Sequence, residues 1–451
     1  MTDQTKLTFW GGLNTIGGNI VSIQYGNYRI ITDFGALAGV NIMDLLSKEA
    51  TNAHLAAGQL PAIAGLYPQS AIGDFDLESF ESSALDTIIC LSHLHLDHLG
   101  AFGQLPEELP IYALEEAVEF YQQLEKTALL PSYKVNWQKV TAEHPLQHGP
   151  FEIVFHESDH DTVGAASIFI KSPDVKIVYS GDFRLTGFHP EKVLNWAQKA
   201  REFEADLFLV EGTTFSHLDT QAPPVDLALA EVTRSINSPN EIKLMNSIEA
   251  VAQAHPEQLI AFNGYPQNIE RLLVLAELFT TLGRSLVMDQ TYFALMKPYL
   301  TGYLNVKYLD LAESGVSPES NDAVTLEMLR EAPQHYILQF DYERHEHVFS
   351  LEAGVYFHSN GMPLGSYMAE YEPYVRRFIE AGWEFYHANV SGHAAPNDLL
   401  LVNYLTQAKL VVPWHTFQPE LYAEALEDIG LKTWLPAYHV TYSADDLSAL
   451  I

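Results

Sequence analysis

The sequence of 451 residues has little cysteine, few basic residues and no long apolar run. Its one cysteine, Cys90, excludes an internal disulfide framework and is typical of a reducing compartment. No apolar stretch is long enough to cross a bilayer, and the N-terminus lacks a basic-then-apolar signal, so we expect a cytoplasmic protein with no membrane partner. Apolar and aromatic residues make up 47% of the chain, which predicts a globular protein of two or three domain-sized units.

Positive charge is scarce. Lysine and arginine number 24 against 58 aspartates and glutamates, which gives a formal net charge of −34 at pH 7. An acidic surface repels phosphate backbones, so the composition disfavours nucleic-acid binding by general charge attraction. A phosphate substrate would need a local positive site, and bound metal ions could supply part of it.

What the sequence does contain is a dense histidine cluster, Ser92-His93-Leu94-His95-Leu96-Asp97-His98. It follows an apolar, β-branched run at 86–91 that predicts a buried strand, and we expect the cluster on the loop beyond it, with no helix. Imidazole nitrogen and carboxylate oxygen are ligands that zinc prefers. The spacing predicts His93 and His95 on one ion, and Asp97 and His98 on a second.

Further ligand-type residues follow other predicted strands, at 28–32, 151–156, 176–179 and 206–210. These residues are Asp33, His160, Asp182 and Glu211. Each alone could be an ordinary polar loop residue, but their repeated placement at strand ends is what an active site along one sheet edge requires. We expect Asp33 to orient ligand histidines from behind.

The pattern resembles the metallo-β-lactamase superfamily, whose His-x-His-x-Asp-His motif is matched at residues 93–98. The family's later histidine matches His160, its bridging aspartate matches Asp182, and its early aspartate matches Asp33. The resemblance implies an α/β fold, the αββα sandwich of that family, with two zinc ions, for which Mn²⁺ is an alternative. The implied ligands are His93, His95 and His160 on the first ion and Asp97, His98 and His415 on the second, with Asp182 bridging.

Residues 216–387 have an α/β rhythm of their own, with strands predicted at 259–262 and 284–288 around a helix at 268–282. Such alternation predicts a parallel sheet with flanking helices. The block resembles the β-CASP domain of ribonuclease J, of messenger RNA 3′-end cleavage factors and of DNA repair nucleases. We therefore expect residues 1–215 and 388–451 to form the metallo-β-lactamase domain, with 216–387 inserted as a β-CASP-like domain.

Three residues match the extra motifs of that branch: Glu211, His393 and His415. Histidine at the third motif resembles the RNA-processing members, whereas DNA-processing members tend to carry valine. The resemblance implies that His393 protonates the leaving oxygen, that Glu211 holds His393 in its charged form, and that Asp97 belongs to the catalytic centre. Ser391 is expected to donate to a phosphate oxygen.

The sequence also departs from ribonuclease J. Asn389 stands where that family usually has a phosphate-binding histidine, although an asparagine side chain can still donate a hydrogen bond to substrate. We predict a two-zinc phosphodiesterase or nuclease, endo- or exonucleolytic, that acts on single-stranded RNA in the manner of ribonuclease J and could form a homo-oligomer. Two alternatives stay open: a small-molecule hydrolase of an ester, thioester or cyclic phosphodiester, and a non-catalytic binding protein that kept the fold.

Overall fold

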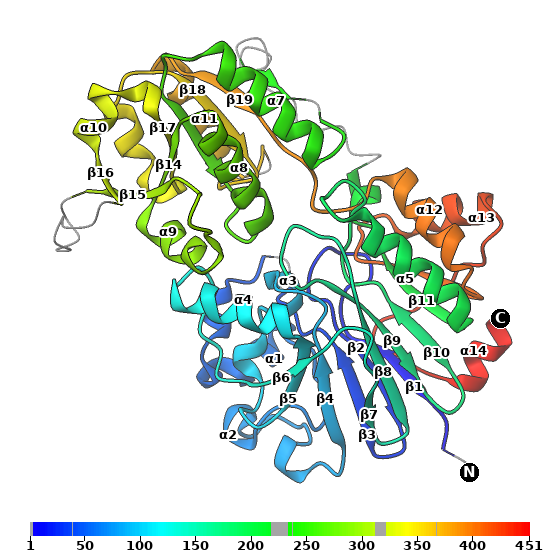
Figure 1. Cartoon of the computed structure of the whole chain (residues 1–451). Helices are drawn as coiled ribbons and strands as arrows, with labels where there is room; N and C mark the ends of the chain where they lie inside the picture. The colour runs from blue at the N-terminus through cyan, green and yellow to red at the C-terminus, as the bar shows by residue number, and fades with distance from the viewer. Residues whose placement is uncertain (1–2, 38, 218–232, 237, 312–321, 367) are drawn as a thin grey trace.

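The computed structural model describes residues 3–37, 39–217, 233–236, 238–311, 322–366 and 368–451. The first two residues of the N-terminal stretch, and 218–232 and 312–321 of the predicted insertion, lie outside the described residues. In the described part of the chain the strands form three sheets (Figure 1).

The first sheet is mixed, with antiparallel pairing from β21 to β3 and parallel pairing from β3 to β6. Its strands, in spatial order, are β21 (Thr441–Ser443), β1 (Lys6–Phe9), β2 (Val21–Tyr25), β3 (Tyr28–Thr32), β4 (Asp86–Cys90), β5 (Pro110–Leu114) and β6 (Asn136–Val140).

The second sheet is also mixed, with antiparallel pairing from β7 to β10 and parallel pairing from β10 to β20. Its strands are β20 (Leu410–Trp414), β11 (Leu207–Glu211), β10 (Lys176–Tyr179), β9 (Ala166–Lys171), β8 (Phe151–Glu157) and β7 (Leu146–His148).

Alternating side chains along β11 explain why the two sheets stack. Leu207 and Leu209 join the core shared by the two sheets, whereas Phe208 and Val210 join a separate core. That outer core also contains Trp196 of α5 (Pro190–Phe203), whose apolar residues recur at helical spacing. A sheet that is apolar on both faces must be covered on both faces. Covering each sheet in this way produces the predicted αββα sandwich.

The third sheet is entirely parallel, as the α/β rhythm predicted. Its strands are β12 (Arg234–Ser235), β19 (Glu384–His387), β18 (Val355–Ser359), β13 (Ile260–Gly264), β17 (Tyr336–Gln339), β14 (Ser285–Met288), β15 (Val306–Asp310) and β16 (Ala323–Thr325). We call this sheet and its helices the parallel-sheet domain; it is consistent with a β-CASP-like insertion.

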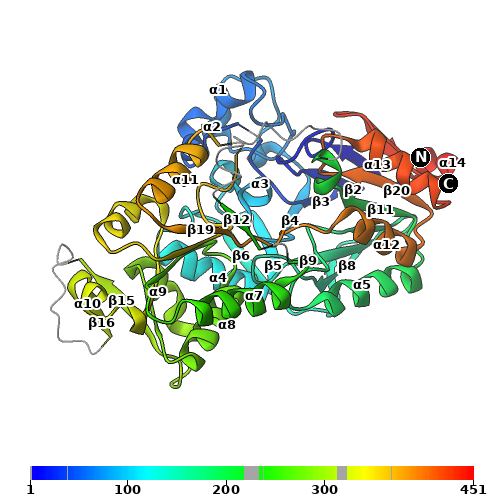
Figure 2. The same cartoon turned by 90° about the horizontal axis from the view of Figure 1, so that it is seen from above.

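Helices cover the outer faces of the sheets in both domains (Figures 1 and 2). On the sandwich and around it lie α1 (Thr51–Ala56), α2 (Gln69–Ile72), α3 (Leu96–Leu99), α4 (Glu115–Lys126), α5, α12 (Pro396–Thr406), α13 (Pro419–Asp428) and α14 (Ala444–Leu450). The parallel-sheet domain carries α7 (Glu241–Ala254), α8 (Ile269–Thr281), α9 (Gln290–Met296), α10 (Leu326–Glu331) and α11 (Tyr371–Glu380). Among the described helices, none is long and apolar enough to cross a membrane.

The strands of the parallel-sheet domain lie between residues 234 and 387, and those of the sandwich lie outside that interval. We propose the domain boundaries 1–215, 216–387 and 388–451 on this basis. A buried ion-pair cluster joins the two units. Glu241 at the start of α7 accepts hydrogen bonds from Arg184 of the sandwich at 2.9 Å and from Arg271 of α8 at 2.7 Å. Removing one partner of a buried pair costs about 3–5 kcal/mol, so the cluster fixes how the domains meet.

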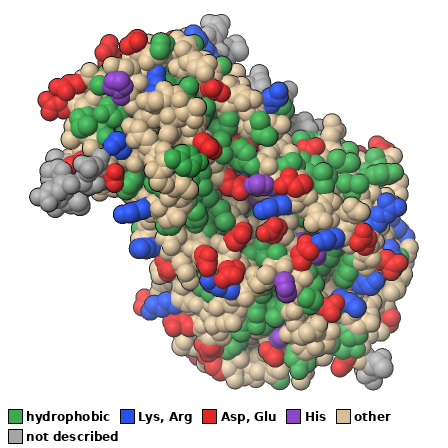
Figure 3. Space-filling model, viewed as in Figure 1, with side chains coloured by type: hydrophobic (Ala, Val, Ile, Leu, Met, Phe, Trp, Pro, Cys, Tyr) green, Lys and Arg blue, Asp and Glu red, His purple; other side chains and the backbone are tan. Residues whose placement is uncertain are grey.

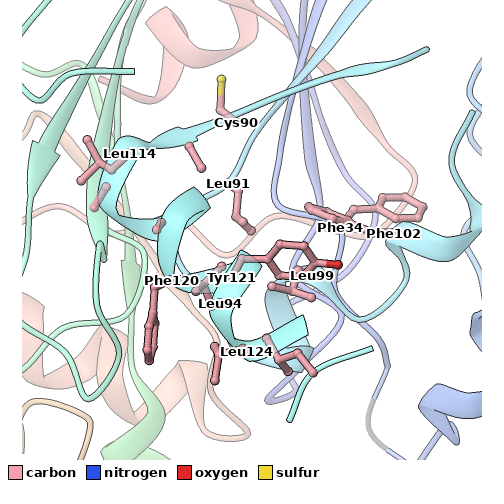
Figure 4. Packing of buried hydrophobic residues seen from close by; sticks show 14 of the residues in the cluster. Phe34, Cys90, Leu91, Leu94, Leu99, Phe102, Leu114, Phe120, Tyr121 and Leu124 are labelled. Carbon is pink, nitrogen blue, oxygen red and sulfur yellow. The ribbon is translucent and has the colours of Figure 1, made fainter. Parts of the chain in front are cut away.

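Leucines anchor the histidine cluster. Leu91, Leu94 and Leu99 are fully buried and pack toward α4, as the labelled side chains of Figure 4 show. Each fully buried leucine contributes about 1.5–3 kcal/mol, which holds the intervening polar residues in place. The structure differs from the sequence expectation in one respect: Asp97 and His98 lie on a one-turn helix, α3, and not on an open loop. A four-residue helix is too short to show periodicity in sequence.

Candidate metal centre

The direction of the strands brings the predicted ligands to one edge. In the second sheet, β8, β10, β11 and β20 all run the same way, because β9 is antiparallel to both β8 and β10. His160, Asp182, Glu211 and His415 follow or end these four strands. The parallel strands β3 and β4 of the facing sheet end just before Asp33 and just before the histidine cluster.

The first group of converging side chains consists of His93, His95, His160 and Asp182, with one ligand atom of each within 4.8 Å of the others. Nε2 of His160 lies 3.1 Å from Nδ1 of His95. Nε2 of His93 lies 3.7 Å from Oδ2 of Asp182. Three imidazoles and a carboxylate at these separations form a donor set that suits zinc.

The second group consists of Asp97, His98, Asp182 and His415. Nε2 of His415 lies 2.9 Å from Oδ2 of Asp97, and Nε2 of His98 lies 3.3 Å from Oδ2 of Asp182. Asp182 therefore belongs to both groups and stands between them. The backbone of His415 is in the left-handed region, with φ of 53°, and its N–H donates to the carbonyl of Gly12. Strained backbone of this kind persists where the surrounding structure imposes it.

Asp33 supports the cluster from behind. Its Oδ2 accepts from Nδ1 of His98 at 2.7 Å and from the hydroxyl of Tyr179 at 2.6 Å, and its Oδ1 accepts from the backbone N–H of Ser92. Because Nδ1 of His98 is the donor to Asp33, Nε2 carries the lone pair and faces Asp182 and Asp97. This is the arrangement that orients a ligand histidine and raises its basicity.

Buried polar atoms without partners show that the site fits a cation. Nε2 of His93 and both carboxylate oxygens of Asp182 are buried and have no hydrogen-bond partner among the described residues. Unpaired buried polar atoms are costly, so their convergence suits a ligand of positive charge. The two groups of four imidazole and carboxylate donors, which share Asp182, would hold two ions.

The pKa shifts of the histidines differ between the two groups of ligands. Burial lowers the pKa of His160 to about 3, and this imidazole is therefore neutral and able to bind a metal. Burial also acts on His415, but the carboxylates of Asp182 and Asp97 outweigh it and raise the pKa to about 10. The carboxylates thus require positive charge between them, which either a proton or a metal ion provides.

A separate pair lies beside the second group. Nδ1 of His393 is 3.4 Å from Oε2 of Glu211, which is fully buried at the end of β11. Burial lowers the pKa of His393, but Glu211 and then Asp182 outweigh burial and raise it to about 9. His393 is 24% exposed, more than the buried ligands His93 and His415, so a substrate could reach it. It also lies within 4.8 Å of Asp182, Glu211 and His415 in a third potential ligand group.

Residues 74–242 match the model of the metallo-beta-lactamase superfamily, and the converging ligands and the sandwich fit that match. This part of the chain belongs to the metallo-β-lactamase superfamily. It has the metallo-β-lactamase fold and a His/Asp metal site.

The chain is also similar to individual members of the superfamily and to one solved structure. It is 26% identical to a protein of unknown function from Enterococcus faecalis, whose crystal structure aligns over 98% of this chain and all of that chain with a TM-score of 0.82. It is 21% identical to ribonuclease J of Thermus thermophilus, over 72% of this chain and 57% of that protein. It is 25% identical to ribonuclease J of Helicobacter pylori, over 40% of this chain and 23% of that protein. The chain thus spans less than two thirds of these curated relatives.

The other predicted site residues lie on the return segment. Ser391 is exposed and its Oγ accepts from the backbone N–H of His393 at 3.0 Å. Oδ1 of Asn389 accepts from the backbone N–H of Asn360, at 2.9 Å, so the amide oxygen is used within the protein. The roles of Ser391 and Asn389 in substrate binding stay predictions.

Sequence reasoning assigned no role to two residues that this metallo-β-lactamase site contains. Asp161 lies within 3.4 Å of ring nitrogens of His95 and His160. Tyr265, in the loop after β13, places its ring 5.7 Å from that of His95 and brings the parallel-sheet domain to the metal centre. Adjacency to His160 was a signal for Asp161. Tyr265 had none, because its contact joins segments far apart in sequence.

Proposed function

We propose that the protein is a two-metal phosphodiesterase that cleaves RNA, with zinc as the ion. The observation that carries the proposal is the Glu211–His393 pair beside a metal centre with two groups of ligands. Hydrolysis of a phosphodiester with a poor leaving group needs such an acid, whereas activated esters do not. The similarity to proteins named ribonuclease J supports RNA as the substrate.

His93, His95, His160 and Asp182 would hold one ion, and Asp97, His98, Asp182 and His415 would hold the other. Bound there, the ions would supply positive charge that favours deprotonation of water and neutralises phosphate oxygens. This local charge is what a protein with net charge −34 needs to accept a phosphate.

The chain's own residues provide the proton. Glu211 accepts hydrogen bonds from the backbone N–H groups of Phe183 and Thr213, which fix its carboxylate. The carboxylate in turn faces Nδ1 of His393 and favours the imidazolium, which leaves Nε2 to protonate the leaving oxygen. Gly392 has no side chain to obstruct the approach of the substrate beside His393.

A small-molecule hydrolase is the second candidate, favoured by the charges near the site. Two buried arginines, Arg184 and Arg271, are both paired with Glu241. On the face shown in Figure 3, basic side chains are scattered among acidic ones and do not gather into a stripe along which RNA could run. A compact phosphodiester would need only the charge of the metal centre.

The deciding experiment offers the zinc-loaded protein several substrates. These are end-labelled single-stranded RNA with and without a 5′-monophosphate, single-stranded DNA of the same sequence, bis-nitrophenyl phosphate, and a nitrophenyl ester and a thioester. We expect metal-dependent cleavage of RNA in preference to DNA. Hydrolysis of bis-nitrophenyl phosphate without cleavage of RNA would favour the compact phosphodiester. Hydrolysis of only the ester or thioester would contradict phosphodiesterase activity.

A further inference from the structure

One carboxylate at the metal centre has no role in the proposed reaction. Oδ1 of Asp161 lies 3.2 Å from Nε2 of His95 and 3.4 Å from Nε2 of His160. The side chain is only 14% exposed, and Oδ1 is buried without a hydrogen-bond partner among the described residues. A buried carboxylate oxygen left in this state needs a donor or a cation.

The two histidines show which nitrogen of each faces the first ion. Nδ1 of His160 donates to the backbone carbonyl of Gly392, so Nε2 of His160 carries the lone pair. Nε2 of His160 lies 3.1 Å from Nδ1 of His95. Neighbouring ligand atoms of a tetrahedral zinc with bonds of about 2.0–2.1 Å are separated by a similar distance, roughly 3.3 Å. Nδ1 of His95 is therefore its inner nitrogen, and Nε2 is the outer one.

We propose that Asp161 is a positioning residue of the metal centre, which accepts a hydrogen bond from Nε2–H of His95 and so turns Nδ1 toward the first ion. A carboxylate behind a ligand histidine fixes its tautomer and raises its basicity. In the second group, Asp33 accepts a hydrogen bond of 2.7 Å from Nδ1 of His98 in this way. Each ion then has one histidine positioned by an aspartate. The inference rests on the two-ion site of the proposed function and not on its substrate.

A substitution at Gly392 offers a second, independent way to perturb the carboxylate of Asp161. A Cβ at position 392 would lie 2.6 Å from Oδ2 of Asp161, closer than side chains tolerate. The backbone of Gly392 is not in the left-handed region, so alanine there would change the occupied space and not the backbone conformation. The segment that carries His393 thus closes over Asp161, and Gly392→Ala should displace the carboxylate without removing it.

The test is a zinc titration of the metal-free full-length chain in competition with a chromophoric chelator, repeated with Co²⁺ to follow coordination by its visible absorption. We expect two binding steps in the natural protein. In Asp161→Ala one step should weaken by about 10–100-fold, the usual cost of losing such a partner, while the other stays unchanged. Asp161→Asn should fall between, because an amide oxygen still accepts the hydrogen bond but carries no charge. Gly392→Ala should weaken the same step.

The matched control is Glu157→Gln, which removes an equal charge from the end of β8, the strand that precedes Asp161. The side chain of Glu157 is 41% exposed and faces Lys192. It should leave both steps unchanged. Native affinity in both Asp161 variants would overturn the proposal, and Asp161→Asn as weak as Asp161→Ala would replace it with direct ligation. Thermal unfolding of each metal-free variant identifies any that fails to fold, in which case Asp161→Asn and Gly392→Ala decide. No step uses a substrate, so a failure of the proposed function would appear separately, as absent phosphodiester cleavage with this order of affinities intact.

Discussion

Buried histidines occur in both domains, but their partners differ. In the sandwich, His93 has a buried Nε2 without a hydrogen-bond partner, at a point where other ligand atoms converge. In the parallel-sheet domain, His358 is just as buried, yet Nδ1 lies 3.0 Å from the hydroxyl of Tyr356 and Nε2 lies 2.9 Å from the carbonyl of Pro363. Burial alone therefore does not identify a functional histidine, whereas an unsatisfied nitrogen aimed at other donors does.

The neighbours of these histidines also differ in charge. Around the sandwich histidines lie Asp97, Asp182 and Glu211, whose charges call for a proton or a metal ion. Around His358 and His387 of the parallel-sheet domain lie tyrosines: Tyr371 bonds His387 at 2.9 Å as Tyr356 bonds His358. We infer that the first set binds metal and performs chemistry and that the second set packs a core. The predictions below separate the two.

Metal removal should have the largest effect. Dialysis of the protein against a strong chelator should lower phosphodiesterase activity by at least about 10³-fold, because Lewis-acid stabilisation is worth several kcal/mol. Zinc should restore it, and elemental analysis of the restored protein should find two ions per chain. One ion or none would contradict two groups of ligands sharing Asp182.

His393→Ala should lower turnover of RNA by about 10²–10⁴-fold, the usual worth of general acid–base catalysis. Metal content should not change, since the two groups of ligands do not need His393. A nitrophenyl phosphodiester, whose leaving group needs no proton, should lose much less. His189→Ala is the control, because the side chain of His189 is 42% exposed and its ring nitrogens face Glu191 and Glu270. Loss of an ion in His393→Ala would instead assign His393 to the third ligand group.

Glu211→Gln should shift the alkaline limb of the pH profile of kcat to lower pH. The acid form of His393 exists below its pKa, so activity is lost as pH rises through that pKa. Glu211 is the main cause that raises this pKa, to about 9, and its neutral amide analogue should let burial lower it. The alkaline limb of kcat against pH should therefore shift to lower pH, with little change at its acidic end. An unshifted limb would show that Glu211 does not hold the proton of His393.

The sequence predicted those features that depend on local pattern. Ligand types at strand ends could be predicted because a strand and the residues that follow it are adjacent in sequence. Parallel pairing then brought the strand ends to one edge. Contacts between segments far apart in the chain could not be predicted from the sequence. The approach of Tyr265 to His95, and the use of the Asn389 amide by Asn360, depend on how the parallel-sheet domain meets the sandwich. Asp161 was visible beside His160, but spacing alone could not show that it faces His95.

The smallest effect is expected in the parallel-sheet domain and concerns stability alone. Burial, with a smaller contribution from His387, lowers the pKa of His358 to about 4. Neutral His358 therefore contributes stability above pH 6.5, and the contribution is lost as pH falls toward 4, by up to about 3 kcal/mol in the free energy of unfolding. In His358→Gln, urea unfolding should show a shallower loss between pH 6.5 and 4, with metal content and kcat unchanged at pH 8. His335→Gln, at an exposed histidine of the same domain, is the control and should alter stability little. A change in metal content in His358→Gln would break the contrast between the two sets of histidines, because it would connect a hydrogen-bonded core histidine to the metal centre.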